Sequence, residues 1–315
     1  HMDSLRGTTI ICSYLFNHFW RVKLDSDSRH EFFQAYQHAM SYGNISMAQF
    51  GFNAWLVTFM YLDDPLTELH VRARSVVSEM RALDAKSGLM FILPNWQLLL
   101  NYSGDVENPD PTSLRGEALD ESFPSYLKEI DSKLGLVNLQ LCEAIIRYAF
   151  DDADGMRKNL WFINKHESEL KGYFTMGFIQ TWLSIFHYEQ YLLLGRRIHR
   201  RLGRMSHRRV RNWATTGTDM LHGPNRLLDA MENLCVLNIS LNDVVLSFQD
   251  AARVCGTQRC RLFEALAYER LAKSLQVHDP EGDSHIIYHS KAMELYRKWG
   301  AMAKVNHLQQ LFDQK

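Results

Sequence analysis

Apolar residues recur at intervals of three and four along most of this chain, and this spacing restricts the fold more than any other feature. A helix turns once in about 3.6 residues, so side chains at these intervals gather on one face of a helix. The stretch from residue 174 to residue 193 shows the pattern best. Strand signals are scarce: runs of β-branched residues are absent apart from short stretches such as Val244 and Val245. The sequence therefore predicts an all-α fold.

Turn-forming residues divide the chain into segments of about 12 to 22 residues, the length of single helices in helical hairpins. The longest irregular stretch, residues 103–124, contains Pro109, Pro111, Pro124 and Gly116. A stretch of this composition is typical of a long loop or a domain boundary. We therefore expect N-terminal helical hairpins in residues 1–102, an irregular loop in 103–124 and a C-terminal helical array in 125–315. One continuous solenoid is the alternative.

A weak internal repeat supports an array of hairpins. The pattern Arg-x-x-Gly ends at Gly256 and again at Gly300, 44 residues later, and a new apolar helical stripe follows each glycine. Two helices in a period of about 34 to 45 residues are typical of tetratricopeptide and related solenoids, because one hairpin cannot bury its own apolar face. The sequence predicts antiparallel helical hairpins stacked as a tetratricopeptide-like, right-handed solenoid. A helical bundle without repeats is the alternative.

Composition excludes several classes of protein. Among 315 residues, 46% are hydrophobic and 23% charged, which suits a globular chain with a large core. The formal net charge of −1 gives no overall field that would attract nucleic acid or an anionic membrane. No apolar run reaches the roughly 18 to 20 residues of a membrane span, so we expect no membrane partner.

The five cysteines indicate a compartment. Their number is odd and none forms a CxxC pair, a usage that fits buried thiols in a reducing environment. We therefore expect a cytoplasmic protein. The His1-Met2 start resembles a cloning remnant, and an apolar pattern begins abruptly after it, so we expect a fragment of a longer chain.

Several short segments carry a resemblance to a known family. They are, in chain order, residues 41–50 (SYGNISMAQF), 59–66 (FMYLDDPL), 95–100 (NWQLLL) and 114–121 (LRGEALDE), followed by 267–272 (AYERLA) and 296–305 (YRKWGAMAKV). These segments resemble the helical middle region of very large multidomain signalling kinases, and the last two resemble the last two repeats of that region. The resemblance covers residues 35–313, and its motifs are packing motifs.

The resemblance implies a context for the chain. Those kinases join a Ser/Thr kinase-like domain, an AAA-type ATPase, a tetratricopeptide-like region, a GAF sensor and often a histidine kinase. By resemblance, this chain is the tetratricopeptide-like region, which links or regulates the neighbouring domains and binds protein. It has no catalytic residues to carry over.

Motifs for catalysis or cofactors are missing from the sequence. There is no G-x-x-x-x-G-K-[ST] and no G-x-G-x-x-G after a strand, so no backbone loop is available to hold phosphates. No G-x-S-x-G elbow presents a serine nucleophile. We therefore predict a protein that is not an enzyme and that needs no cofactor.

Two clusters resemble metal sites. His285 and His289 lie one helical turn apart, a spacing that can hold zinc, but no glutamate follows the first histidine and no third ligand is near. We therefore favour a structural pair over a metal site. Asp151 to Gly155 hints at a calcium loop but lacks its first ligand and its final glutamate, so these acids more plausibly cap the next helix.

The sharpest local feature is a basic segment, residues 196–211, with eight arginines in sixteen residues. Guanidinium groups bind carboxylates or phosphates through two donors at once. Three interpretations compete: a solvated helix face paired with the chain's own acids, docking to an acidic protein surface, and binding of nucleic acid or anionic lipid. Nucleic acid is disfavoured because only Trp213 lies close enough to stack on a base. The residues predicted to contact a partner are Arg197, Arg200, Arg201, Arg204 and Arg208.

These observations lead to a ranked set of functions. The first is a non-catalytic interaction module within a larger signalling protein, with a protein or peptide as partner and an acidic surface on that partner. Its own neighbouring kinase, ATPase and sensor domains are partners that the resemblance implies. The alternative is a regulatory domain that senses a small molecule or peptide inside the superhelix. A metal enzyme built on His285 and His289 is a distant third.

Overall fold

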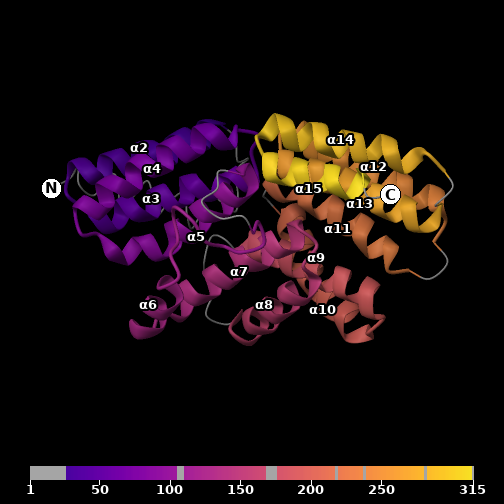
Figure 1. Cartoon of the computed structure of the whole chain (residues 1–315), viewed down its shortest axis with the longest axis horizontal. Coiled ribbons are helices and arrows are strands. Elements are labelled where there is room, and N and C mark those ends of the chain that lie inside the picture. The colour runs from indigo at the N-terminus through magenta and orange to yellow at the C-terminus, as the bar shows by residue number, and fades with distance from the viewer. Residues whose placement is uncertain are drawn as a thin grey trace. The chain divides into compact units, whose positions relative to one another are not determined.

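A computed structural model describes residues 26–104, 110–167, 176–216, 219–236, 239–279 and 282–313. Within these ranges the chain forms fourteen α-helices, labelled α2 to α15, and no strand (Figure 1). The predicted all-α class is confirmed. The helices group into two compact units. Unit 1 contains the described residues of His1–Phe59 and Asp64–Phe174, and unit 2 those of Met60–Asp63 and Thr175–Lys315.

Unit 1 is built on a row of helices that pack against one another in alternation. α3 packs against α5 and α5 against α7, while α2, α4, α6 and α8 each pack on one member of this row. Phe52 on α3 and Trp96 on α5 are among its largest fully buried side chains. The helices of unit 1 are α2 (Ser26–Ser41), α3 (Ile45–Val57), α4 (Leu66–Ala82), α5 (Lys86–Ser103), α6 (Phe123–Glu129), α7 (Lys133–Ala149) and α8 (Ala153–Lys165).

Unit 2 repeats the same kind of packing. α9 packs against α11 and α11 against α13, and each helix from α9 to α15 also packs against the next in sequence. Trp182 and Phe186 on α9 and Phe263 on α13 form an aromatic cluster in its core. The helices of unit 2 are α9 (Met176–Leu194), α10 (Arg197–Thr216), α11 (His222–Leu234), α12 (Leu241–Thr257), α13 (Arg261–His278), α14 (Ser284–Trp299) and α15 (Met302–Asp313).

Six of the interhelical turns share one backbone geometry. In each, a residue with positive φ ends a helix, and the N–H of the next residue donates to the carbonyl five positions earlier at 2.8 to 3.0 Å. This pattern is the Schellman motif, which satisfies carbonyls that a helix end would leave without partners. The residues with positive φ are Gly43, Asp84, Asp131, Asp151, Arg259 and Gly300.

These turns correct the register of the predicted repeat. Gly256 lies inside α12 rather than in a turn, and Arg259 takes the left-handed position instead. Arg259 and Gly300 are 41 residues apart, as are Gly43 and Asp84. The 44-residue spacing expected from Arg-x-x-Gly was therefore wrong by three residues, because a non-glycine residue adopts the conformation that normally favours glycine.

The predicted irregular loop is ordered where it is described. Gln97 Oε1 accepts hydrogen bonds from the N–H groups of Ala118 and Leu119, at 2.9 and 3.2 Å. Asn101 Nδ2 donates to the carbonyls of Pro111 and Ser113. The loop thus lies within unit 1, held by α5. The prediction of helical hairpins on either side of it stays a prediction.

Two further expectations concern thiols and membranes. Cys142, Cys235, Cys255 and Cys260 are free and buried, and Cys12 lies outside the described residues. Burial raises the pKa of Cys260 to about 12, so this thiol stays protonated at neutral pH. Within the described part of the chain, no helix combines the length and the hydrophobicity needed to cross a bilayer.

Candidate functional site on helix α10

Helix α10 is strongly amphipathic because its small and apolar residues recur on one side. Gly203, Ser206, His207, Val210 and Ala214 are buried, and this side packs on α9 and α11. The Ser184 hydroxyl donates to the Gly203 carbonyl at 2.9 Å. A Cβ at position 203 would lie 2.9 Å from the Tyr188 ring, so only glycine permits this close approach of α9 and α10. The opposite side of α10 is left for the arginines.

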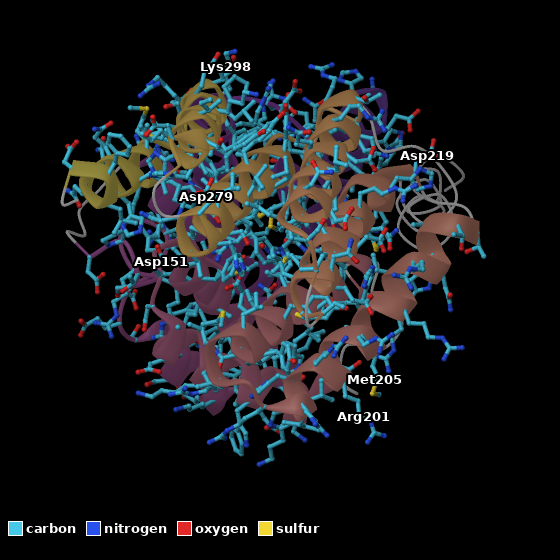
Figure 2. The ribbon with its side chains drawn as sticks, turned by 90° about the vertical axis from the view of Figure 1, so that its right-hand side faces the viewer. Asp151, Arg201, Met205, Asp219, Asp279 and Lys298 are labelled. Atoms are coloured by element: carbon cyan, nitrogen blue, oxygen red, sulfur yellow. The ribbon has the colours of Figure 1, made fainter. Side chains whose placement is uncertain are left out.

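Three of the five predicted contact residues are exposed without a partner. Arg197, Arg201 and Arg208 have neither an ion pair nor a hydrogen bond to another side chain in the described ranges. At positions i, i+4 and i+11 they lie within about 40° of one another around the helix. Figure 2 shows Arg201 extending from the outer edge of α10. We refer to Arg197, Arg201 and Arg208 as the free arginines.

The other two predicted residues make contacts within unit 2. Arg204 Nε lies 2.7 Å from Glu232 Oε1, in an ion pair with α11. Arg200 is half-buried, and its guanidinium carbon lies 5.8 Å from the centre of the Tyr191 ring, in a cation–π contact. The basic segment thus divides in two: Arg204 and Arg200 contact other residues of unit 2, whereas the free arginines are exposed.

A buried ionic cluster fixes α10 on α11. His207 Nδ1 lies 3.0 Å from Glu232 Oε2, and His207 Nε2 lies 3.4 Å from Asp229 Oδ1. Arg211 Nη2 donates to Asp229 Oδ1 at 2.8 Å. The hydrogen bond from His207, aided by the charges of Arg204 and Arg211, lowers the pKa of Glu232 to about 2. Both acids therefore remain charged at neutral pH and hold the basic helix in one orientation.

Burial and hydrogen bonding have opposite effects on the pKa of His207. Burial lowers its pKa, but the hydrogen bonds to Asp229 and Glu232 raise the pKa by more, so the net shift is upwards. The charged imidazole is favoured because two carboxylates face it. His207 therefore belongs to the support of the basic face, since it is fully buried and cannot reach a partner.

Exposed apolar side chains lie next to the free arginines. Ile198 is 52% exposed and Met205 49% exposed, both on α10. Leu193, at the end of α9, is also exposed. A partner on this face would meet bidentate cationic donors and apolar contacts together, a combination found at protein interfaces, where arginine and methionine are enriched.

The residues that orient α10 were not predicted from the sequence. Asp229 and Glu232 are three residues apart on α11, and this spacing places both carboxylates on one face of the helix. That spacing was a usable signal, since a pair of acids one turn apart suits a neighbouring basic helix. The buried His207 could not be recognised, because histidine is common in both polar and apolar positions.

The two sites considered for metals have other roles. Among the described residues, no cluster of three or more histidines, cysteines or acids could hold a metal ion. His285 Nδ1 lies 2.7 Å from the Gly282 carbonyl, and the His289 ring stacks on Phe312. Asp152 Oδ1 accepts a hydrogen bond from the Gly155 N–H at 2.9 Å and so caps α8, as expected from the sequence.

Known proteins offer no further guide to this surface. Comparison of the chain with family models, with curated proteins and with solved structures finds no match. The function must therefore be argued from the chain's own residues.

Proposed function

We propose that this chain is a non-catalytic helical-repeat module that binds an acidic protein or peptide surface through the basic face of α10. One observation carries the proposal: the free arginines share one helix face, exposed and without partners among the described residues. Elsewhere, exposed arginines are commonly paired, as in Arg115 with Glu121 and Arg253 with Asp250. Unpaired guanidinium groups on a fixed helix are ready to bind carboxylates bidentately.

The packing order of the helices supports a tetratricopeptide-like, right-handed solenoid as the architecture. In such arrays, alternate helices form a continuous row and the helices between them cover it. The rows α3–α5–α7 in unit 1 and α9–α11–α13 in unit 2 have this arrangement. The shared turn geometry and the recurring separation of 41 residues are further support.

The proposed context is a larger signalling protein in the cytoplasm. The motifs that resemble the helical region of multidomain kinases include Trp96 and Trp299, and both side chains are buried. Residues of this kind maintain the fold, so function in the proposed module lies on its surfaces. Neighbouring kinase, ATPase and sensor domains of a longer chain are candidate partners, and the buried free thiols suit a reducing compartment.

Protein is a better candidate than nucleic acid as the partner of α10. Stacking on bases needs exposed aromatic rings among the basic residues, whereas Trp213 is only partly exposed. Exposed Ile198 and Met205 instead offer apolar contact to another side chain.

A pocket in unit 1 favours a second candidate function, the sensing of a small ligand.

The proposal is tested by selecting a random displayed-peptide library on the intact chain. We expect the selected peptides to combine several acidic residues with at least one apolar residue. Selection on the variant R197E/R201E/R208E should lose this enrichment, because the charge of the face is reversed.

A matched control separates the position of the reversed charges from the change in net charge. Variant R115E/R157E/R253E changes net charge equally but at exposed arginines that pair with nearby acids. It should select the same acidic peptides as the wild type. If the control loses the enrichment as fully as the free-arginine variant, or if the wild type selects no acidic sequences, the proposed docking role of α10 is wrong.

A further inference from the structure

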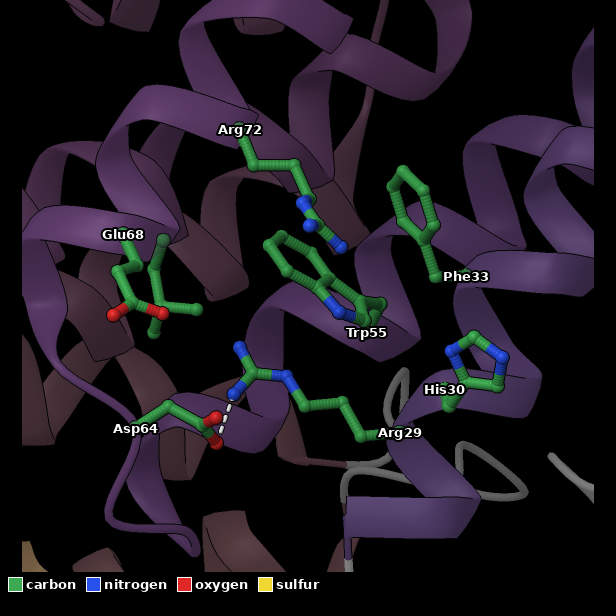
Figure 3. Close-up of a pocket in the computed structure, with 8 residues that line it drawn as sticks. Arg29, His30, Phe33, Trp55, Asp64, Glu68 and Arg72 are labelled. Atoms are coloured by element: carbon green, nitrogen blue, oxygen red, sulfur yellow. Dashed lines mark ion pairs between the residues drawn. The ribbon is translucent and has the colours of Figure 1, made fainter.

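A buried arginine in unit 1 lies against an aromatic ring and a small cavity. Arg29 on α2 is 5% exposed, and its guanidinium carbon lies 4.7 Å from the centre of the Trp55 ring. Arg72 on α4 covers Phe33 at 4.5 Å and Trp55 at 5.6 Å. Figure 3 shows the two guanidinium groups on opposite sides of Trp55. These residues line a cavity of about 180 Å³ between α2, α3 and α4.

Arg29 has hydrogen-bond donors without acceptors. Its Nη1 forms an ion pair with Asp64, whereas Nε and Nη2 are buried and no described residue accepts a hydrogen bond from them. A buried donor without a partner costs about 1 to 3 kcal/mol, more when the group is charged, so such groups are rare in folded proteins. Nε and Nη2 form the edge of a guanidinium group that binds a carboxylate through two parallel hydrogen bonds. An edge with two donors and no acceptor matches the two oxygens of a planar anion such as a carboxylate.

The size of the cavity limits the ligand. A volume of about 180 Å³ is smaller than the range of about 300 to 1,000 Å³ for drug-sized ligands, so it suits one small group. A shallow groove of about 660 Å³ continues from it along α2 and α4 and shares Phe33, Glu68 and Arg72. The groove leaves room for a longer molecule that carries the small group.

The charges around the cavity favour a monoanion. Arg29 and Arg72 supply two positive charges, and Asp64 and Glu68 supply two negative charges. Because the two signs balance, little net attraction offsets the desolvation of a bound anion. This cost rises steeply with the charge of the anion, so a dianion such as phosphate is disfavoured relative to a single carboxylate. The aromatic walls formed by Phe33 and Trp55 would contact an apolar group attached to it.

We propose that the pocket of Arg29, Trp55 and Arg72 binds a carboxylate-bearing ligand, whose carboxylate occupies the Nε/Nη2 edge of Arg29 and whose apolar part contacts the aromatic walls. Burial lowers the pKa of Arg29, a sign of its poor solvation, and a bound anion would compensate for this. This site is independent of the basic face of α10, which lies in unit 2.

The test is isothermal titration calorimetry of the intact chain with four probes. These are acetate, benzoate, inorganic phosphate and an extended hexapeptide that ends in phenylalanine with a free carboxylate. We expect benzoate to bind at least tenfold more tightly than acetate or phosphate, because only benzoate offers both a monoanion and an aromatic group. If neither benzoate nor the peptide binds, or if phosphate binds more tightly than benzoate, the proposal is overturned.

The peptide distinguishes the two sources of the carboxylate. If the carboxylate belongs to the C-terminus of a peptide, contacts in the groove should make the hexapeptide bind at least tenfold more tightly than benzoate. Amidation of the peptide's C-terminus should then remove this gain in affinity. If the ligand is a free organic acid, the peptide should bind no better than benzoate. Both results support the carboxylate site and differ only in its source.

Three variants separate binding from folding. Arg29→Lys keeps the positive charge beside Asp64 but lacks the bidentate edge, so affinity for benzoate should fall at least tenfold. Arg72→Gln alters an exposed residue of the same pocket and should also weaken binding, which keeps the test valid if Arg29→Lys fails to fold. Arg74→Lys, in an ion pair with Glu117 outside the pocket, is the control and should bind normally. Unchanged affinity in both pocket variants would contradict the proposal.

Discussion

The buried ionisable residues of unit 2 are stabilised in two different ways. Glu269 and Lys304 are both buried and lie 2.9 Å apart, so each charge has a partner. His187 is equally buried but faces another imidazole, with its Nδ1 3.1 Å from His199 Nδ1. Burial, and repulsion from His199, lower the pKa of His187 to about 3. His187 is therefore neutral in the folded chain at physiological pH.

His187 should make the chain sensitive to mild acid. In the unfolded chain its pKa is about 6.5, so between pH 6.5 and 3 the unfolded state binds a proton that the folded state does not. Its contribution to the free energy of unfolding is complete above pH 6.5 and falls as the pH drops. Between pH 6.5 and 5 we expect a loss of up to about 2 kcal/mol, measured by urea unfolding.

The control must separate His187 from other titrating groups. His207 has a raised pKa, so its contribution has the opposite sign: it is present below pH 6.5 and is lost as the pH rises through the folded-state pKa. The quantity to compare is therefore the difference in the free energy of unfolding between wild type and His187→Gln. This difference should shrink as the pH falls. A parallel pH dependence of the two proteins would show that His187 has the same pKa in the folded and the unfolded chain.

At the scale of the helix, the turns determine where each element ends. Gly43 has φ of +70° and no heavy atom within 4 Å of the position that a Cβ would take. Gly43→Ala therefore changes backbone strain without a steric clash, and we expect the free energy of unfolding, measured by thermal unfolding, to fall by about 1 to 2 kcal/mol.

Asp131 has φ of 50° at the equivalent position before α7. Asp131→Gly should be stabilising by up to about 1 kcal/mol, because relief of about 1 to 2 kcal/mol of backbone strain exceeds the about 0.4 to 1 kcal/mol of added chain entropy in the unfolded state.

Opposite signs for these two substitutions are the expected result. If both substitutions lower the melting temperature, the Asp131 side chain stabilises its turn by more than the left-handed conformation costs. The two turns would then not be equivalent. Aspartate tolerates the left-handed conformation better than most residues, which explains its use at Asp84, Asp131 and Asp151.

The helices could be predicted from the sequence, but several of their ends could not. Apolar spacing over residues 174–193 identified α9, most of whose residues are buried. The end of α12 was misplaced, since Gly256 is a stronger turn signal than Arg259, whose conformation is supported by an ion pair with Asp63. Tertiary contacts of this kind override local propensity and are not visible in a single sequence.

At the scale of the whole molecule, a short segment of the N-terminal third belongs to unit 2. Met60–Asp63 contributes Tyr61, whose ring centre lies 5.7 Å from that of Phe178 and 6.1 Å from that of Phe263. Asp63 pairs with Arg259 and Arg261. Unit 2 therefore depends on residues more than a hundred positions before its other helices, which no local pattern could reveal.

Tyr61→Ala should destabilise unit 2 selectively. Removal of a buried aromatic ring costs about 3 to 5 kcal/mol. Native-state hydrogen exchange should show reduced protection in α9 and α13, with little change in α2 and α3. Tyr61→Phe is the control: it removes a hydroxyl that is buried without a hydrogen-bond partner, so stability should stay the same or rise. Loss of protection in α2 and α3 instead would contradict the assignment of this segment to unit 2.

The candidate sites were predictable to different degrees. Residues 196–211 stood out because eight arginines in sixteen residues are visible in any reading of the sequence. Which of them are free could not be foreseen, because this depends on the acids of α11. The Arg29 pocket gave no sequence signal at all, since Arg29, Trp55 and Arg72 come from three helices and meet only in the folded unit.

The most direct test of the central claim is the dissociation constant for one acidic peptide from the library selection. It should be measured by calorimetry at low and at physiological salt with wild type, R197E/R201E/R208E and R115E/R157E/R253E. We predict that the free-arginine variant binds at least tenfold more weakly, that the control binds like wild type, and that wild-type affinity falls with salt. Equal affinity of the free-arginine variant and wild type would show that the basic face of α10 is a solvated surface rather than a binding site.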